Sequence, residues 1–395
     1  MLIGLVGKPS SGKSTFFKAA TLAEVDIAPY PFTTIKSNHG VGYVKVDCID
    51  KEFRVKCQPN HGFCIKGNRF VPVELMDVAG LVPGASEGKG LGNQFLDELR
   101  QADVFIHILD TSGTTDEEGK PVESHDPSKD ILFLENELNR WFYNIMVKAW
   151  KSFVRKVEQE EGNFAEAVAK QFSGLKVTEN HAKRVLSRLR LPEKPINWSE
   201  DHLFWFASEL RTESKPTIIA ANKIDLEKSN ANYQFLKMKF PGLIIIPCSA
   251  DSELALREAA KLDLIDYIPG ERNFEIKGKL SSAQNAALSK IKENVLDKFK
   301  EATGVQEILN YAVFSLLKYI AVFPVESANK LTDSKGRVLP DCFLLPSGST
   351  ALNLAYSLHT DFGNNFIKAI DAKTKKIIGK NYELKHRDAL EIVTK

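Results

Sequence analysis

The sequence predicts an α/β fold in which the first strand leads directly into a phosphate-binding loop. Short apolar runs occupy residues 1–6, 71–76, 104–109, 217–221 and 243–247. Runs of this length, bounded by turn signals, are typical of buried strands. The first, second, fourth and fifth runs each lead into one of the motifs described below. The remainder of the chain predicts a helical insertion and a small β-rich domain at the end.

The first apolar run leads into the sequence GKPSSGKST. Its G-x-x-x-x-G-K-S pattern is that of a phosphate-binding loop, whose backbone N–H groups surround a polyphosphate. Lys13 places a positive charge near the β- and γ-phosphates, and the Ser14 hydroxyl can bind Mg²⁺. A helix that begins here favours the same anion. We predict nucleotide contacts from Gly7, Lys8, Ser10, Ser11, Gly12, Lys13, Ser14 and Thr15.

A second motif, NKID, predicts the base. The Asp225 carboxylate can accept hydrogen bonds from guanine N1–H and N2–H₂, whereas adenine has neither donor on that edge. Asn222 can tie this loop to the phosphate loop, and the stem of Lys223 can cover the base. Ser249 and Ala250 follow the next apolar run, where the Ala250 amide could donate to guanine O6.

Residues expected to contact the γ-phosphate and Mg²⁺ lie between these motifs. Asp77 follows a predicted strand and can hold Mg²⁺, and the Gly80 N–H can touch the γ-phosphate. Thr34 offers a second hydroxyl to the metal. We therefore predict Ser14, Thr34 and Asp77 as metal ligands, and Lys13, Thr34 and Gly80 as catalytic residues.

Leu81 occupies the position where Ras-like enzymes carry a glutamine that orients the attacking water. A leucine side chain cannot hold water. The catalytic help must come from another group, or the intrinsic rate must be slow.

In this order, the motifs resemble those of Obg-superfamily GTPases of the YchF-related branch. The most specific stretches are YPFTTIKSNHGVG at 30–42 and DVAGLVPGASEGKGLGNQFLDELRQAD at 77–103. The resemblance implies an enzyme that hydrolyses GTP with Mg²⁺. YchF proteins themselves depart from NKxD and prefer ATP, whereas this chain retains the motif. Some relatives hold K⁺ through an asparagine that is Ser10 here, so a K⁺ requirement stays open.

A long segment separates the strand at 104–109 from the strand at 217–221, where one helix would suffice. From 131 to 157, apolar residues recur every three or four positions, which predicts an amphipathic helix. Thr178 and Ser199 are predicted helix N-caps. Further helices are expected at 164–172, 179–189 and 200–210. Basic residues in this insertion could contact RNA backbone or form a solvated face.

The C-terminal region begins with predicted helices at 280–299 and 305–319, followed by short strands. The sequence LPSGST, with Ser349 as expected cap of the helix at 351–358, resembles a TGS domain. This small β-grasp module occurs on Obg-type GTPases. Basic residues outnumber acidic ones in its last part, which is compatible with RNA contact.

These patterns predict a nucleotide-binding domain from residues 1–112 and 213–280, a helical insertion at 113–212, a connector at 281–319 and a TGS domain at 320–395. The resemblance implies that the insertion and the TGS domain contact a ribosome or RNA. Two alternatives remain open from the sequence. One is an ATP-hydrolysing YchF-like protein, and the other is a nucleotide-gated RNA- or ribosome-binding module with negligible turnover.

Composition is consistent with a multidomain protein that has no global attraction to nucleic acid. The chain has 395 residues, 43% of them hydrophobic, and a net charge of +2. No apolar run reaches the length of a membrane span. The first strand enters the phosphate loop directly, leaving no room for a signal peptide. We therefore expect a cytoplasmic, monomeric protein without membrane contact.

Cys48, Cys57, His61 and Cys64 lie close together in the sequence. Three thiolates and an imidazole could bind zinc, but their spacing is not that of a standard finger. A disulfide is disfavoured in a reducing cytosol. We expect free thiols in a packed loop, near the tip of a strand pair within 41–73.

Overall fold

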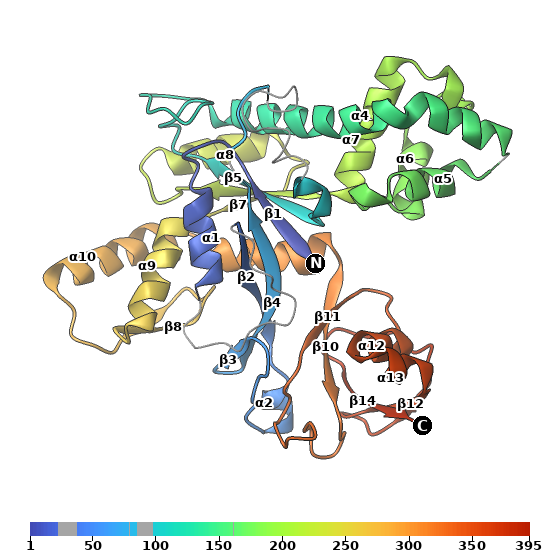
Figure 1. The fold of residues 1–395 in the computed structure, drawn as a ribbon. Coiled ribbons are helices and arrows are strands. Elements are labelled where there is room, and N and C mark those ends of the chain that lie inside the picture. Colours follow the sequence, from blue (N-terminus) through green and yellow to red (C-terminus); the bar gives the residue numbers. More distant parts are fainter. Residues whose placement is uncertain (23–37, 79, 85–97, 161) are drawn as a thin grey trace.

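The computed structural model describes residues 1–22, 38–78, 80–84, 98–160 and 162–395. Within them, a seven-stranded sheet has the order β2-β4-β1-β5-β6-β7, and β3 also pairs with β4 (Figure 1). The strands are β1 (Leu2–Val6), β2 (His39–Asp47), β3 (Phe63–Ile65), β4 (Asn68–Asp77), β5 (Val104–Asp110), β6 (Thr217–Asn222) and β7 (Ile245–Pro247). The path from β4 to β7 is parallel, whereas β2 and β3 run antiparallel to β4. The predicted strands are confirmed.

Both faces of this sheet are buried, which explains why its strands read as apolar runs rather than as alternating patterns. Ile3 and Ile106 pack with Phe16 on one face, where α1 (Lys13–Thr21), α9 (Ala250–Lys261) and α11 (Val305–Asn310) lie. Val6 and Phe105 face the opposite side and join an apolar cluster with the insertion.

The insertion between β5 and β6 contains the predicted helices. They are α4 (Pro127–Gln159), α5 (Phe164–Gln171), α6 (Glu179–Arg188) and α7 (Glu200–Ser214), with short 3-10 turns η3 (Ser173–Leu175) and η4 (Pro195–Asn197). Thr178 and Ser199 cap their helices as expected, each accepting a hydrogen bond from the third helical amide.

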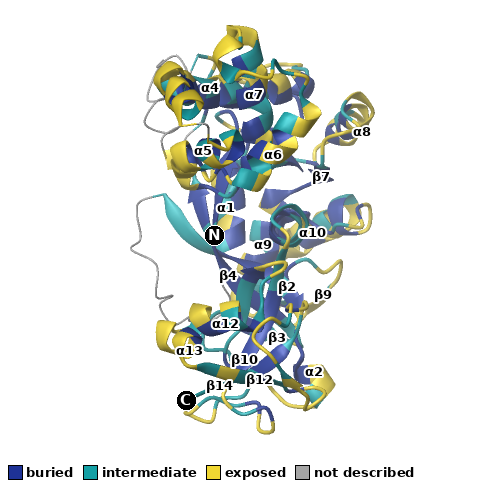
Figure 2. Cartoon of the chain, turned by 90° about the vertical axis from the view of Figure 1, so that its right-hand side faces the viewer, coloured by how far each residue is buried: buried dark blue, intermediate teal, exposed yellow. Residues whose placement is uncertain are grey.

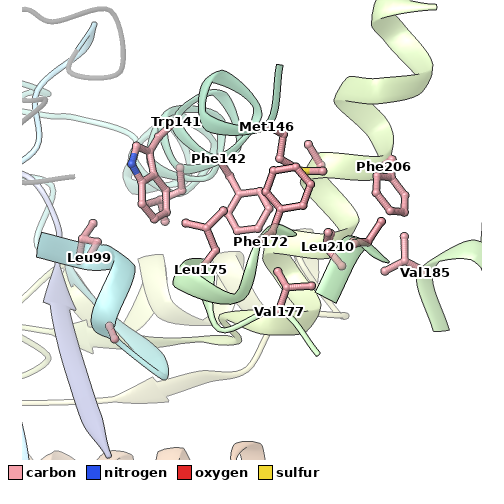
Figure 3. Close-up of a cluster of buried hydrophobic side chains, with 14 of the residues drawn as sticks. Leu99, Trp141, Phe142, Met146, Phe172, Leu175, Val177, Val185, Phe206 and Leu210 are labelled. Atoms are coloured by element: carbon pink, nitrogen blue, oxygen red, sulfur yellow. The ribbon is translucent and has the colours of Figure 1, made fainter. Parts of the chain in front are cut away.

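Besides a small cluster of Ile131 with Leu109 and Ile219, one large apolar cluster connects the insertion to the sheet. Figure 3 shows Trp141, Phe142 and Phe206 in this cluster, which extends to Leu99 in the turn η2 (Leu99–Gln101) before β5. Trp141, Phe142 and Trp150 of α4 are therefore core residues, whereas Trp205 of α7 is exposed. Because the cluster is continuous, the insertion is packed onto the nucleotide domain rather than tethered to it.

α8 (Ser229–Lys239) connects β6 to β7, and after α9 the chain forms the separate small pair β8 (Ile265–Tyr267) and β9 (Phe274–Ile276). The helices predicted at 280–299 and 305–319 are shorter than expected. In the first, α10 (Ser282–Ile291) changes to a π-helical turn at Lys292–Leu296. In the second, α11 changes to a π-helical turn at Tyr311–Leu316 before β10 begins at Tyr319.

The C-terminal domain is a five-stranded sheet of order β11-β10-β14-β12-β13, in which β10 and β14 are parallel. Its elements are β10 (Tyr319–Val325), β11 (Phe343–Pro346), α12 (Ala351–Leu358), α13 (Thr360–Asn364), β12 (Phe366–Asp371), β13 (Ile377–Ile378) and β14 (Ala389–Thr394). The predicted cap of α12 was wrong by one residue. Thr350, not Ser349, accepts the hydrogen bond from the Asn353 amide.

The insertion and the C-terminal domain lie at opposite ends of the molecule, with the nucleotide domain between them. This arrangement is seen in both views (Figures 1 and 2). Of the helices that the structure describes, none combines the length and apolar character needed to cross a membrane. The insertion and the C-terminal domain therefore lie on either side of the nucleotide domain.

Candidate nucleotide-binding site

The predicted phosphate loop connects β1 to α1, and its two glycines are required by close packing. Gly7 and Gly12 have φ angles of 151° and 94°. A Cβ atom on Gly7 would lie 2.5 Å from the Ile108 carbonyl oxygen, and one on Gly12 would lie 2.3 Å from Asn222 Nδ2. Only glycine fits both the conformation and the space. The curled backbone places the loop at the N-terminus of α1, where an anion is favoured.

Lys13 is held inside this loop. Its Nζ donates to the carbonyl oxygens of Gly7 and Lys8, at 3.1 and 2.8 Å. Burial lowers the pKa of Lys13 to about 8, although the nearby Asp77 carboxylate acts in the opposite direction. A bound polyphosphate would strongly stabilise this buried ammonium, because its negative charge compensates for the hydration that burial removed.

Ser14 and Asp77 lie together beside the loop. Ser14 Oγ donates to Asp77 Oδ2 at 3.0 Å, and Asp77 is the last residue of β4. Burial raises the pKa of Asp77, against the effects of Ser14 and Lys13. A hydroxyl and a carboxylate at this distance are the hard oxygen donors that Mg²⁺ prefers, so the pair fits the predicted metal. Thr34, the other predicted ligand, lies outside the described residues.

Asn222 joins three separate motifs. Its Nδ2 donates to the Ser11 carbonyl oxygen at 2.9 Å, so the expected tie to the phosphate loop is confirmed. Its Oδ1 accepts from the Ala250 amide at 3.0 Å, and Ser249 Oγ donates to Asp225 Oδ1 at 2.7 Å. Because the Ala250 amide already has a partner, the contact predicted with guanine O6 requires this hydrogen bond to be shared or exchanged.

Asp110 fixes Lys223 and was not found from the sequence. Lys223 has a left-handed backbone, with φ 62°, and its Nζ lies 2.7 Å from Asp110 Oδ2. Burial alone would raise the pKa of Asp110, but hydrogen bonds from Lys223, Ser112 and Thr115 bring it below its usual value. The sequence offered one indication of this role. Asp110 is the last residue of β5, and ligands bind at the carboxyl ends of parallel strands.

The side chain of Lys8 turns away from the phosphate loop. Its Nζ lies 2.8 Å from Asp130 Oδ2 in α4 and donates to the Thr115 carbonyl oxygen. Lys8 and Asp130 are 2% and 1% exposed, and His125 Nε2 contacts the other oxygen of Asp130 at 2.7 Å. Lys8 can therefore reach a phosphate through its backbone but not through its charge, contrary to the simplest expectation from the motif.

The segment after β4 contacts both the phosphate loop and α4. A Cβ on Gly80 would lie 2.8 Å from Pro9 N, and the Leu81 amide donates to the Gly7 carbonyl oxygen at 3.0 Å. The Gly84 amide donates to Glu137 Oε1 at 2.8 Å. Leu81 itself is buried in the cluster shared with α4. The side chain at the usual glutamine position thus packs in the core instead of facing water.

His107, on β5 near the loop, was also missed by sequence reasoning. Burial, together with the charges of Lys13 and Lys8, lowers the pKa of His107 to about 3. The imidazole is therefore neutral at pH 7 and adds no positive charge beside Lys13. No motif marked this residue, since it reads as one position of an apolar strand.

Comparison with known proteins places this site in a family. Residues 2–137 match the model "50S ribosome-binding GTPase", residues 220–327 match "Obg-like GTPase YGR210-like, G4 motif-containing domain", and residues 331–394 match "TGS domain". The Uncharacterized GTP-binding protein MJ1332 of Methanocaldococcus jannaschii is 48% identical, with 100% of this chain and 99% of the relative covered. The chain belongs to the Obg-like/YchF family of GTPases.

Two further proteins are similar to this chain over nearly its whole length. A GTP-binding protein from Pyrococcus horikoshii OT3, solved as a crystal structure, is 41% identical with a TM-score of 0.79, and 100% of both chains is covered. The Ribosome-binding ATPase YchF of Buchnera aphidicola is 28% identical, with 93% of this chain and 86% of the relative covered. The P-loop fold, the helical region and the C-terminal TGS domain predicted from the sequence are therefore confirmed.

Nucleotide affinity of this family member should fall as the pH rises above about 8. The free Lys13 ammonium loses its proton near that pH, whereas a bound polyphosphate raises the pKa of Lys13 in the complex. Binding above this pH takes up a proton, so affinity should drop by up to about tenfold per pH unit. Calorimetric titration with nucleotide between pH 7 and 9 measures the slope. Lys13→Met supplies the slope due to all other groups, and equal slopes in the two proteins would contradict the assignment.

Proposed function

We propose that the protein binds GTP with Mg²⁺, hydrolyses it to GDP and phosphate, and uses the bound nucleotide to control its contact with a ribosome or RNA. The observation that carries the guanine preference is the Asp225 carboxylate, which is oriented by Ser249 and belongs to the loop that Asn222 ties to the phosphate loop. A carboxylate in this place pairs with two donors that guanine has and adenine lacks.

Different residues around the phosphate loop bind the phosphates and neutralise their charge. Backbone N–H groups of residues 7–15, except Pro9, and the Lys13 ammonium surround the phosphates. Ser14 and Asp77 hold Mg²⁺, which when bound neutralises charge that develops on the phosphate oxygens. Gly80 packs closely on Pro9 of the phosphate loop, and we assign its amide to the γ-phosphate. Hydrolysis proceeds by attack of water on that phosphate.

The burial of Leu81 supports a slow intrinsic reaction. Its side chain is 1% exposed and packs with the insertion, so it neither orients nor admits water. A group other than Leu81 would have to orient the water. The same observation supports the alternative of a nucleotide-gated binding module with negligible turnover.

An ATPase is the second candidate, since the relative from Buchnera aphidicola bears that name. The oriented Asp225 carboxylate favours GTP, because ATP would leave it facing a base edge without matching donors. An unpaired buried polar group costs about 1–3 kcal/mol. This difference decides our preference for GTP.

Asp225→Asn should weaken GTP binding by about 10- to 100-fold, in line with the cost of an unmatched polar group. Xanthosine triphosphate should recover the loss, because its C2 carbonyl accepts from the new amide. Competition against a fluorescent nucleotide measures both effects. Glu227→Gln, which removes an exposed carboxylate two residues away, is the matched control and should leave the affinities unchanged. Equal competition by ATP and GTP for the unmodified protein would contradict the guanine assignment.

The ribosome or RNA contact is supported by the words of one family model and one relative, and by a basic strip on α4. Arg184 and Arg188 in α6 both pair with Glu213, which neutralises much of that part of the insertion. Lys148, Lys151 and Arg155 are exposed and recur every three or four residues along α4. This strip is the better site for a polyanion, because its charges lie on one face of the helix.

Ribosome co-sedimentation should be stronger with a non-hydrolysable GTP analogue than with GDP, and should weaken with salt as phosphate contacts release counterions. Lys148→Glu combined with Lys151→Glu should reduce the pelleted fraction several-fold. Lys290→Glu combined with Lys292→Glu makes the same charge change at exposed sites outside the insertion, and serves as the control. Equal pelleting of the two double variants would rule out the α4 strip as the contact.

A further inference from the structure

Three thiols and one carboxylate gather at the tip of the β2–β4 strand pair. Cys48 directly follows β2, Asp50 begins the short helix α2 (Asp50–Phe53), Cys57 lies in the loop after it, and Cys64 lies in β3. One ligand atom from each residue lies within 4.8 Å of all the others. The sequence suggested His61 as the fourth residue of this cluster, but the described structure brings Asp50 there instead.

The spacing of these atoms matches metal coordination better than a disulfide. The Sγ atoms of Cys48 and Cys57 are 3.7 Å apart, and Cys64 Sγ is 4.0 Å from Asp50 Oδ2. Tetrahedral zinc, with Zn–S bonds of about 2.3 Å, holds neighbouring sulfur atoms about 3.8 Å apart. A disulfide requires about 2.05 Å. The first pair already has the zinc spacing, and the second pair is within a few tenths of an ångström of it.

Burial gives an independent sign of a ligand at this cluster. Asp50 is 8% exposed, and its buried Oδ1 has no hydrogen-bond partner among the described residues. Buried carboxylate oxygens without a partner are costly. A cation bound by Asp50 removes that cost, and three thiolates select a soft divalent ion such as zinc over Mg²⁺ or Ca²⁺.

Figure 1 shows α2 next to the C-terminal domain, so the cluster lies where the nucleotide domain meets that domain. Cys48 and Cys57 share an apolar cluster with Phe323 and Ala389 of that domain. We define residues 54–62 as the docking loop. The backbone N–H groups of Gln58 and Asn60 donate to the carbonyl oxygens of Val338 and Pro340, respectively, each at 2.8 Å.

Arg69 strengthens the same junction from the neighbouring strand. Its guanidinium is fully buried and donates to the carbonyl oxygens of Leu339 and Pro340, at 3.0 and 2.6 Å. The docking loop itself has no regular secondary structure. A metal that cross-links Cys57 to β3 and α2 would therefore hold the loop in the shape that its contacts with the C-terminal domain require.

We propose that Cys48, Asp50, Cys57 and Cys64 bind one zinc ion, which fixes the docking loop against the C-terminal domain. The site is structural, because all four positions are filled by protein ligands and none is left open for a substrate. It is separate from the nucleotide site, so its loss and the failure of the proposed function are distinguishable.

Metal analysis of the full-length protein tests this site. After purification and dialysis against metal-free buffer, mass spectrometry of the elements should find about one zinc per chain. Cys57→Ser and Cys64→Ser should each lower bound zinc at least tenfold. Cys342→Ala changes a cysteine packed beside the same apolar cluster, and His61→Ala changes the fourth residue suggested by the sequence. Both controls should retain zinc.

A second measurement does not depend on variants that fold. Replacement of zinc by Co²⁺ in the unmodified protein should give the absorption bands of tetrahedral thiolate coordination. Removal of the metal by a chelator should increase hydrogen exchange in the docking loop and at 337–340 several-fold, while the phosphate loop is unchanged. Absence of zinc, iron in its place, or a mass lower by two hydrogens from a disulfide would each overturn the proposal.

Discussion

The buried ion pair between Lys8 and Asp130 joins the phosphate loop to the helical insertion. Both side chains are almost completely removed from solvent, and His125 contacts the second oxygen of Asp130. A buried pair of this kind need not stabilise the fold more than apolar residues would. Removal of one partner is nevertheless costly, by about 3–5 kcal/mol, because a charge is left uncompensated. The register of α4 against the phosphate loop is therefore strongly specified.

Together with a second contact, this ion pair links α4 to both the phosphate loop and the segment after β4. Asp130 holds the phosphate loop, and Glu137 accepts the amide of Gly84 from the segment after β4. Leu81 packs in the apolar cluster that α4 shares with α7. A helix of 33 residues spans about 50 Å. In the function that we propose, α4 is the element that would carry a change at the nucleotide to the basic strip near its far end.

The sequence predicted the features that depend on local pattern. The strands, the insertion helices, two of their caps and the nucleotide motifs follow from apolar periodicity and from residues adjacent in the chain. It missed pairings between distant residues, such as Lys8 with Asp130 and Lys223 with Asp110, because periodicity contains no information on which strand end meets which helix. Asp50 was missed for a similar reason, since spacing among cysteines does not show which side chains turn inward.

The errors of detail also have physical causes. Ser349 and Thr350 are both good caps, and the choice between them depends on where the backbone leaves β11. The helix expected at 305–319 ends early because Tyr319 begins the edge pairing of β10 with β11, and strand pairing overrides an apolar pattern that either structure could satisfy. The predicted domain boundaries remain proposals.

Hydrogen exchange in the first turns of α4, residues 127–142, tests the coupling most directly. The unmodified protein should exchange more slowly there with a non-hydrolysable GTP analogue than with GDP. In Asp130→Asn, which keeps the shape but removes the charge, nucleotide should still bind, and this difference should be lost. The same nucleotide-dependent difference in Asp130→Asn, or none in the unmodified protein, would contradict the view that the ion pair transmits the nucleotide state.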